Sequence, residues 1–118
     1  MSKPIGPYTP VVEVDGWLIC SGQIGVTGTP PELISGDVAG QLRQAFANLT
    51  ELLETKGATL ANVVKMTVFM VDMADYSVMN EIYAECFGET RPARSAVAVA
   101  GLPRGAQIEL EAWARSSD

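Results

Sequence analysis

Two separate segments that each carry a single apolar stripe constrain the fold of this chain most. From Val38 onward, apolar residues recur at spacings of three and four, which predicts an amphipathic helix of about 19 residues. Asp37 is a suitable N-cap for it, and Gly57 a suitable C-terminal stop. Residues 75–87 repeat an apolar pair every four positions and predict a second helix, with Asp75 as its cap. Each helix has one face to bury, which favours two helices on one face of a sheet.

The segments before the first helix predict a hairpin and a loop. Residues 11–14 and 17–20 are rich in β-branched and apolar side chains. The dipeptide Asp15-Gly16 between them readily reaches the positive φ values of a tight hairpin turn. Glycines and prolines interrupt any regular period over residues 21–37, so this segment is expected to be a structured loop, with a short strand at 32–34.

Three further strands complete the expected sheet. Residues 63–71 are mostly apolar, with polar Lys65 and Thr67 two positions apart, which indicates a strand with one largely buried face. Residues 95–100 and 107–114 predict the last two strands. The resulting order, β-β-(β)-α-β-α-β-β, indicates an α+β fold with a mixed sheet. Its second face would be left for neighbouring subunits to cover.

Length and composition limit what such a domain can be. The chain has 118 residues, 47% of them hydrophobic and 19% charged, which predicts one ordered domain over residues 1–118. With glycine counted as apolar and tyrosine left out, the apolar share slightly exceeds that of most globular chains. Since a short chain buries a limited part of its surface, the surplus predicts burial between subunits of a homo-oligomer.

Charge and residue usage argue against several classes of function. Fourteen acidic against eight basic residues give a net charge of −6, which disfavours nucleic acids and anionic membranes as partners. The chain has no histidine and no paired CxxC motif, so neither a metal nor another cofactor is expected. The two cysteines, Cys20 and Cys86, are expected to be free thiols in a reducing, cytoplasmic compartment. Residues 1–10 do not resemble a signal peptide, and no apolar run is long enough to span a membrane.

Charged residues near the predicted strand ends are candidates for catalysis or for binding a substrate. Arg91 and Arg94 lie where a loop enters a strand, so either could receive an anion or form a surface ion pair. Glu109 and Glu111 lie two apart on the last strand, where they could act as a carboxylate pair or simply face solvent.

Taken together, seven fragments resemble the RidA/YjgF family, also called the endoribonuclease L-PSP family. Their order and spacing cover nearly the whole chain, although each fragment alone has low specificity. The fragments are Ile5-Gly6-Pro7-Tyr8, Ser21-Gly22-Gln23-Ile24, Gly36-Asp37, residues 63–69, Met79-Asn80-Glu81-Ile82-Tyr83, Pro92-Ala93-Arg94-Ser95 and Ile108-Glu109-Leu110-Glu111-Ala112.

The resemblance implies a chorismate-mutase-like fold, a homotrimer with clefts between subunits, and hydrolysis of 2-imino acids or their enamine tautomers to 2-oxo acids and ammonia. It identifies Arg94 with the family's carboxylate-binding arginine, and Glu109 with the acid that positions or deprotonates the attacking water. An imine is already electrophilic, so a carboxylate clamp, an oriented water and a proton acceptor suffice without a cofactor.

The same resemblance implies further substrate contacts. Ser21 and Gly22 match a turn that lines the family's pocket, and could otherwise only end a strand. Tyr8 matches a tyrosine near the substrate, or could merely pack over the N-terminal arm. Asn80 corresponds to a pocket residue, although alone it would be taken for a surface position.

Three positions depart from the family pattern and leave the substrate's side chain open. Ala96 replaces a frequent cysteine whose backbone would still line the site, Gly101 replaces a basic residue, and Thr9 replaces a serine. The expected function is that of a 2-iminobutanoate/2-iminopropanoate deaminase. The alternatives are a pathway-specific aminoacrylate or aminomuconate deaminase, and a non-catalytic trimer that binds 2-oxo acids or a protein partner.

Overall fold

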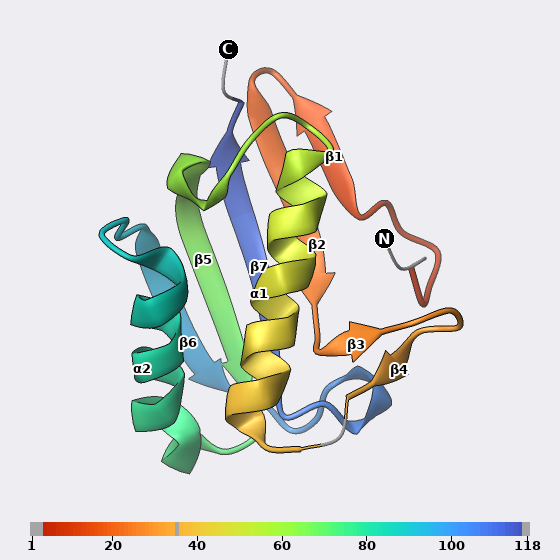
Figure 1. The fold of residues 1–118 in the computed structure, drawn as a ribbon, viewed down its shortest axis with the longest axis vertical. Helices are drawn as coiled ribbons and strands as arrows, with labels where there is room; N and C mark the ends of the chain where they lie inside the picture. Colours follow the sequence, from red (N-terminus) through yellow and green to blue (C-terminus); the bar gives the residue numbers. More distant parts are fainter. Residues whose placement is uncertain (1–3, 35, 117–118) are drawn as a thin grey trace.

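A computed structural model describes residues 4–34 and 36–116 and shows two helices packed on a mixed sheet (Figure 1). The main sheet has the strand order β1-β2-β7-β5-β6, in which β5 and β6 are parallel and the other neighbours are antiparallel. Its strands are β1 (Val11–Val14), β2 (Trp17–Gln23), β5 (Val63–Met70), β6 (Ala93–Ala98) and β7 (Ile108–Arg115). The other elements are β3 (Val26–Thr27), β4 (Glu32–Leu33), α1 (Val38–Glu54), α2 (Tyr76–Phe87) and the short 3-10 turns η1 (Leu60–Asn62), η2 (Met73–Asp75) and η3 (Pro103–Gly105).

The predicted hairpin is confirmed. β1 and β2 are antiparallel, and Val14 pairs with Trp17 across the two-residue turn. Asp15 and Gly16 adopt φ values of 51° and 79°, so both occupy the left-handed region that this kind of turn needs. The short strand expected at 32–34 is present as β4, which pairs with β3, a partner that the sequence did not predict.

The two residues predicted to bound helix α1, Asp37 at its start and Gly57 after its end, have these roles in the structure. The Asp37 side chain accepts a hydrogen bond from Gly40 N, 3.0 Å away. The regular helix ends at Glu54, earlier than predicted, and Gly57 closes the following turn at φ 71°. There Gly57 N donates to Glu54 O and Ala58 N to Leu53 O, the hydrogen-bond pattern of a Schellman motif.

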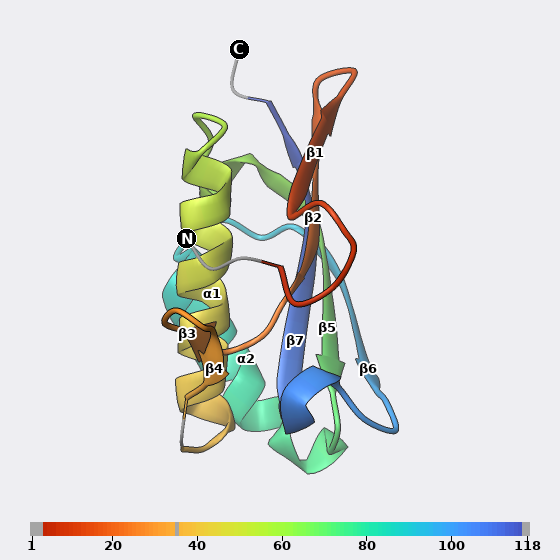
Figure 2. The ribbon, with the colours of Figure 1, turned by 90° about the vertical axis from the view of Figure 1, so that its right-hand side faces the viewer.

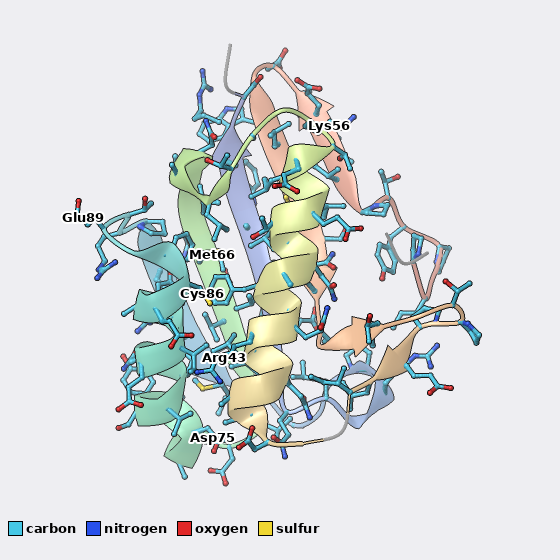
Figure 3. All side chains as sticks on the ribbon, viewed as in Figure 1. Arg43, Lys56, Met66, Asp75, Cys86 and Glu89 are labelled. Atoms are coloured by element: carbon cyan, nitrogen blue, oxygen red, sulfur yellow. The ribbon has the colours of Figure 1, made fainter. Side chains whose placement is uncertain are left out.

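Both helices lie on the same face of the sheet, as predicted (Figure 2). The apolar stripe of α1 is buried there at every predicted position, together with the polar Gln41, and the helix contacts β2 and β7. In Figure 3, Arg43 of α1 lies toward α2, where its Nε donates to Glu85 Oε2 at 3.0 Å. No helix in the described part of the chain covers the opposite face of the sheet.

Two predicted details were wrong at the second helix and the strand after it. β6 covers Ala93–Ala98 and not 95–100, because its parallel pairing with β5 begins at Lys65 and Ala93. Asp75 lies at the N-terminus of α2, but its side chain makes no capping hydrogen bond. Asp72 caps the preceding 3-10 turn η2, by accepting from Ala74 N, and the chain enters α2 through that turn.

No helix in residues 4–34 and 36–116 is both long and apolar enough to cross a membrane.

Gly25 provides a test of the packing between α1 and the segment after β2. A Cβ at this buried position would lie 2.8 Å from both the Cα and the carbonyl oxygen of Gln41 in α1. We expect Gly25→Ala to lower the free energy of unfolding by about 1–3 kcal/mol, since backbone must move to admit the methyl group. Chemical denaturation measures this.

Gly40→Ala is the matched control, because a Cβ there meets only ordinary contacts at 3.6 Å and 3.8 Å. This change within α1 should hold or raise stability. Equal stability of Gly25→Ala and the wild type would contradict the close packing.

Candidate functional site

A pocket of about 400 Å³ opens beside β2, between the N-terminal arm and α1. The arm closes one side with Tyr8, and Asn48 and Leu52 of α1 form part of the wall. The remaining lining residues are Pro4, Ile5, Pro10, Ser21, Gly22, Gln23, Ile24, Val26, Pro103 and Glu109. The pocket therefore brings together four of the residues that the sequence predicted for the site, from three separate segments.

An irregularity in the sheet shapes this pocket. Cys20 pairs with Ala112 and Gln23 with Leu110, so three steps along β2 oppose two steps along β7. The extra residue is a β-bulge, which bends a strand and redirects its side chains. It falls at Ser21 and Gly22, the predicted pocket turn.

Ser21 also holds the N-terminal arm against the sheet. Its backbone N donates to Pro10 O at 2.8 Å, and its Oγ donates to Thr9 O at 2.6 Å. The arm that carries Tyr8 is thus tied to the bulge, and the Ser21 oxygen keeps lone pairs that can accept a hydrogen bond.

The Glu109 carboxylate lies directly against Gly22. A Cβ built on Gly22 would lie 1.8 Å from Glu109 Oε2 and 2.8 Å from its Cδ, so only glycine fits there with the carboxylate in this position. Within the described part of the chain, no hydrogen bond or ion pair of the Glu109 carboxylate is found. The carboxylate is available to accept a hydrogen bond from a ligand or a water.

The environment of Glu109 favours its protonated form. Burial raises the pKa of its carboxyl above the ordinary value, and the negative charge of Glu111 raises it further. A half-buried carboxyl with a raised pKa in a pocket is typical of a group that both accepts and returns a proton.

Tyr8 combines the two roles that the sequence left open. Its hydroxyl accepts a hydrogen bond from Ile5 N at 3.4 Å, and its ring contacts Gly6 closely, so it packs over the arm. The same side chain lines the pocket and is 43% exposed. Its hydroxyl proton remains able to donate.

Arg94 lies outside this pocket, near the far edge of the sheet. It projects from β6 toward α2, where its Nη1 donates to Asn80 Oδ1 at 2.8 Å and its Nη2 to Tyr76 Oη at 3.1 Å. The guanidinium carbon lies 4.9 Å from the ring centroid of Tyr83, a cation–π distance. The structure thus brings Arg94 and Asn80 together, but not with Glu109.

Ala96 follows Arg94 on β6 and packs against the main core, also outside the pocket. Tyr76 is a contact that the sequence analysis missed. It lies four residues before Asn80, one helical turn away on the same face of α2, and that spacing was visible in the sequence.

The thiols offer no nucleophile to this site. Burial raises the pKa of Cys20 to about 11, and burial with Glu85 raises that of Cys86. Among the residues that the structure describes, no group of three or more His, Cys, Asp or Glu side chains could hold a metal ion.

Comparison with known proteins identifies the family to which this chain belongs. The family model described as Endoribonuclease L-PSP matches residues 1–116, and the chain belongs to this family, also known as RidA/YjgF. The resemblance predicted from the sequence is confirmed.

Named relatives and solved structures agree with this family. The chain is 45% identical over 112 residues to a RutC family protein of Pyrococcus horikoshii, covering 95% of this chain and 89% of that protein. It is 46% identical over 110 residues to the human 2-iminobutanoate/2-iminopropanoate deaminase, covering 93% and 80%. The crystal structure of a putative endoribonuclease from Thermotoga maritima matches with a TM-score of 0.93 and 42% identity, covering 99% and 92%.

Glu111 allows the cause of the Glu109 pKa shift to be tested. Glu111→Gln removes the charge that adds to the effect of burial, so we expect the pKa of Glu109 to fall toward its ordinary value while staying above it. Carbon-detected NMR titration of the carboxyl groups measures this shift. An unchanged Glu109 pKa in Glu111→Gln would exclude coupling between the two carboxylates.

Proposed function

We propose that this protein is an imine deaminase that hydrolyses 2-iminobutanoate and 2-iminopropanoate to 2-oxo acids and ammonia. The observation that carries the proposal is the unpaired Glu109 carboxylate, held against Gly22 inside a pocket of about 400 Å³. The deaminase names of relatives at about 45% identity support the same reaction.

In the proposed reaction, Glu109 acts on water. It accepts a proton as the water oxygen bonds to the carbon of the protonated imine, which gives a neutral carbinolamine. It then returns that proton to the nitrogen. The C–N bond breaks as the hydroxyl proton of the carbinolamine passes to Glu109, which releases ammonia and the 2-oxo acid, and Glu109 finally loses the proton to solvent. Burial raises the pKa of Glu109 above its ordinary value, which makes its carboxylate a stronger proton acceptor than an exposed one.

Arg94 is proposed to bind the substrate's carboxylate, for which its planar guanidinium is well suited. One copy of the chain holds Arg94 among side chains of α2, apart from the pocket with Glu109. A site that uses both residues therefore needs a second copy, whose Arg94 approaches the pocket of the first. We propose the homotrimer with clefts between subunits on this ground.

The uncovered face of the sheet supports assembly. Trp113, Val64 and Val97 are exposed large apolar side chains, and Trp113 is 42% exposed. A hollow of about 490 Å³ on this surface is lined by Trp17, Val64, Lys65, Thr67, Glu111 and Trp113. Apolar surface of this kind is usually buried between protein chains. The free thiols of Cys20 and Cys86 fit the proposed cytoplasmic location.

A pathway-specific deaminase is the second candidate. The volume of the pocket, about 400 Å³, lies within the range of sites that hold drug-sized ligands. It is larger than the volume that a four-carbon acid fills. An aminomuconate would use more of this space.

The activity is tested with imines generated in situ by an amino-acid oxidase, while semicarbazide competes for free imine. Wild type should produce 2-oxo acid faster than the trap captures imine, and both Arg94→Ala and Glu109→Gln should abolish this. Because the folded-state pKa of Glu109 is raised, its ionised form weakens the fold above that pKa. Glu109→Gln should therefore keep or increase thermal stability at neutral pH.

Mixing the two inactive variants tests whether the site is shared. If each site takes Arg94 from one copy and Glu109 from its neighbour, randomly mixed trimers should regain about a quarter of wild-type activity. No recovery after refolding of the mixture, or a light-scattering mass of 12.5 kDa for the wild type, would contradict a shared site. Binding of 2-oxobutanoate without turnover of any imine would indicate a non-catalytic binding protein.

Gly22→Ala tests the position of the Glu109 carboxylate. The new methyl group must displace Glu109 Oε2, and a reacting group moved by about 1 Å can lose about 100-fold in rate. We expect kcat to fall by about that factor, while thermal stability changes little because the displaced group is the end of a flexible side chain. Gly40→Ala, which meets no close contact, should retain full activity.

A further inference from the structure

The guanidinium of Arg94 makes three polar contacts with side chains of α2. Nη1 donates to Asn80 Oδ1 at 2.8 Å and contacts Met79 Sδ at 3.5 Å. Nη2 donates to the Tyr76 hydroxyl at 3.1 Å. These three contacts fix the rotation of the guanidinium about its long side chain.

These contacts also determine which N–H donors of Arg94 remain for a ligand. A guanidinium has five N–H donors, and the three contacts leave Nε–H and one N–H on Nη2. A carboxylate bound in a bidentate manner takes two N–H donors. Within residues 4–34 and 36–116, no hydrogen bond uses Nε of Arg94.

We infer that Tyr76 is a positioning residue for substrate binding: its hydroxyl orients Arg94 so that Nε and Nη2 are presented to the carboxylate of a 2-imino acid. The inference rests on the proposed function and adds to it a residue that does not itself touch the substrate. Tyr76 is 41% exposed at the start of α2, so it contributes little to the core.

Tyr83 provides a matched comparison on the same helix. Its ring lies 4.9 Å from the guanidinium carbon of Arg94, against 5.6 Å for the Tyr76 ring. Its buried hydroxyl, however, has no hydrogen-bond partner among the described residues. Phenylalanine at either position keeps the ring, and only at position 76 does it remove a contact to Arg94.

The experiment compares Tyr76→Phe with Tyr83→Phe in the assembled protein. We expect Tyr76→Phe to raise KM for 2-iminobutanoate and Kd for 2-oxobutanoate by about fivefold, the effect of losing one hydrogen bond. Its kcat should stay within about twofold of wild type, because carboxylate binding is the same in ground and transition states. Tyr83→Phe should leave all three values unchanged, and thermal melting checks that both variants fold.

Arg94→Ala in the same titration separates this inference from the proposed function. If Arg94→Ala loses 2-oxobutanoate binding while Tyr76→Phe behaves like Tyr83→Phe, the positioning role of Tyr76 is wrong and the role of Arg94 stands. A lower kcat with unchanged KM in Tyr76→Phe would also overturn it. If Arg94→Ala binds 2-oxobutanoate as the wild type does, the proposed carboxylate site itself is wrong.

Discussion

The burial of α1 on one face of the sheet is the interaction on which the rest of this structure depends. Leu42, Leu49 and Leu53 have no exposed surface and pack against the central strands. α2 packs beside α1 on the same face, and the aromatic rings of Phe46, Tyr83 and Phe87 meet between the two helices. Because no helix of residues 4–34 and 36–116 covers the other face, alternate residues of the same strands, such as Trp113, stay exposed there.

In a single copy with this arrangement, the residues of the proposed site lie in two separate places. The Glu109 pocket depends on α1 for part of its wall and on the bulge at Ser21 and Gly22 for its shape. Arg94 lies on β6, where α2 supplies its hydrogen-bond partners. In a single copy, one face of the sheet is uncovered and Arg94 lies apart from the Glu109 pocket. The proposed assembly would cover the sheet and bring the two residues together.

The parts of the fold that local chemistry controls were predictable. The left-handed turn at Asp15-Gly16 and the closure of α1 at Gly57 follow from the φ values that these residues adopt easily. The start of β6 was not predictable, because its first residues look like a loop until pairing with Lys65 extends the strand to Ala93. The capping hydrogen bond predicted for Asp75 is absent for a similar reason: the chain enters α2 through the 3-10 turn η2, and the side chain that caps this turn is that of Asp72.

The sequence by itself determined the helices, most of the strands along the chain and the family, because apolar periodicity, turn residues and a set of ordered fragments can be read locally along the chain. It also identified Arg94 and Glu109 as the residues to follow. Only the tertiary structure decided that Glu109 contacts Gly22, that Tyr76 holds Arg94, and that Arg94 and Glu109 lie apart. Contacts between distant segments depend on strand register and on a bulge, and neither leaves a periodic signal in the sequence.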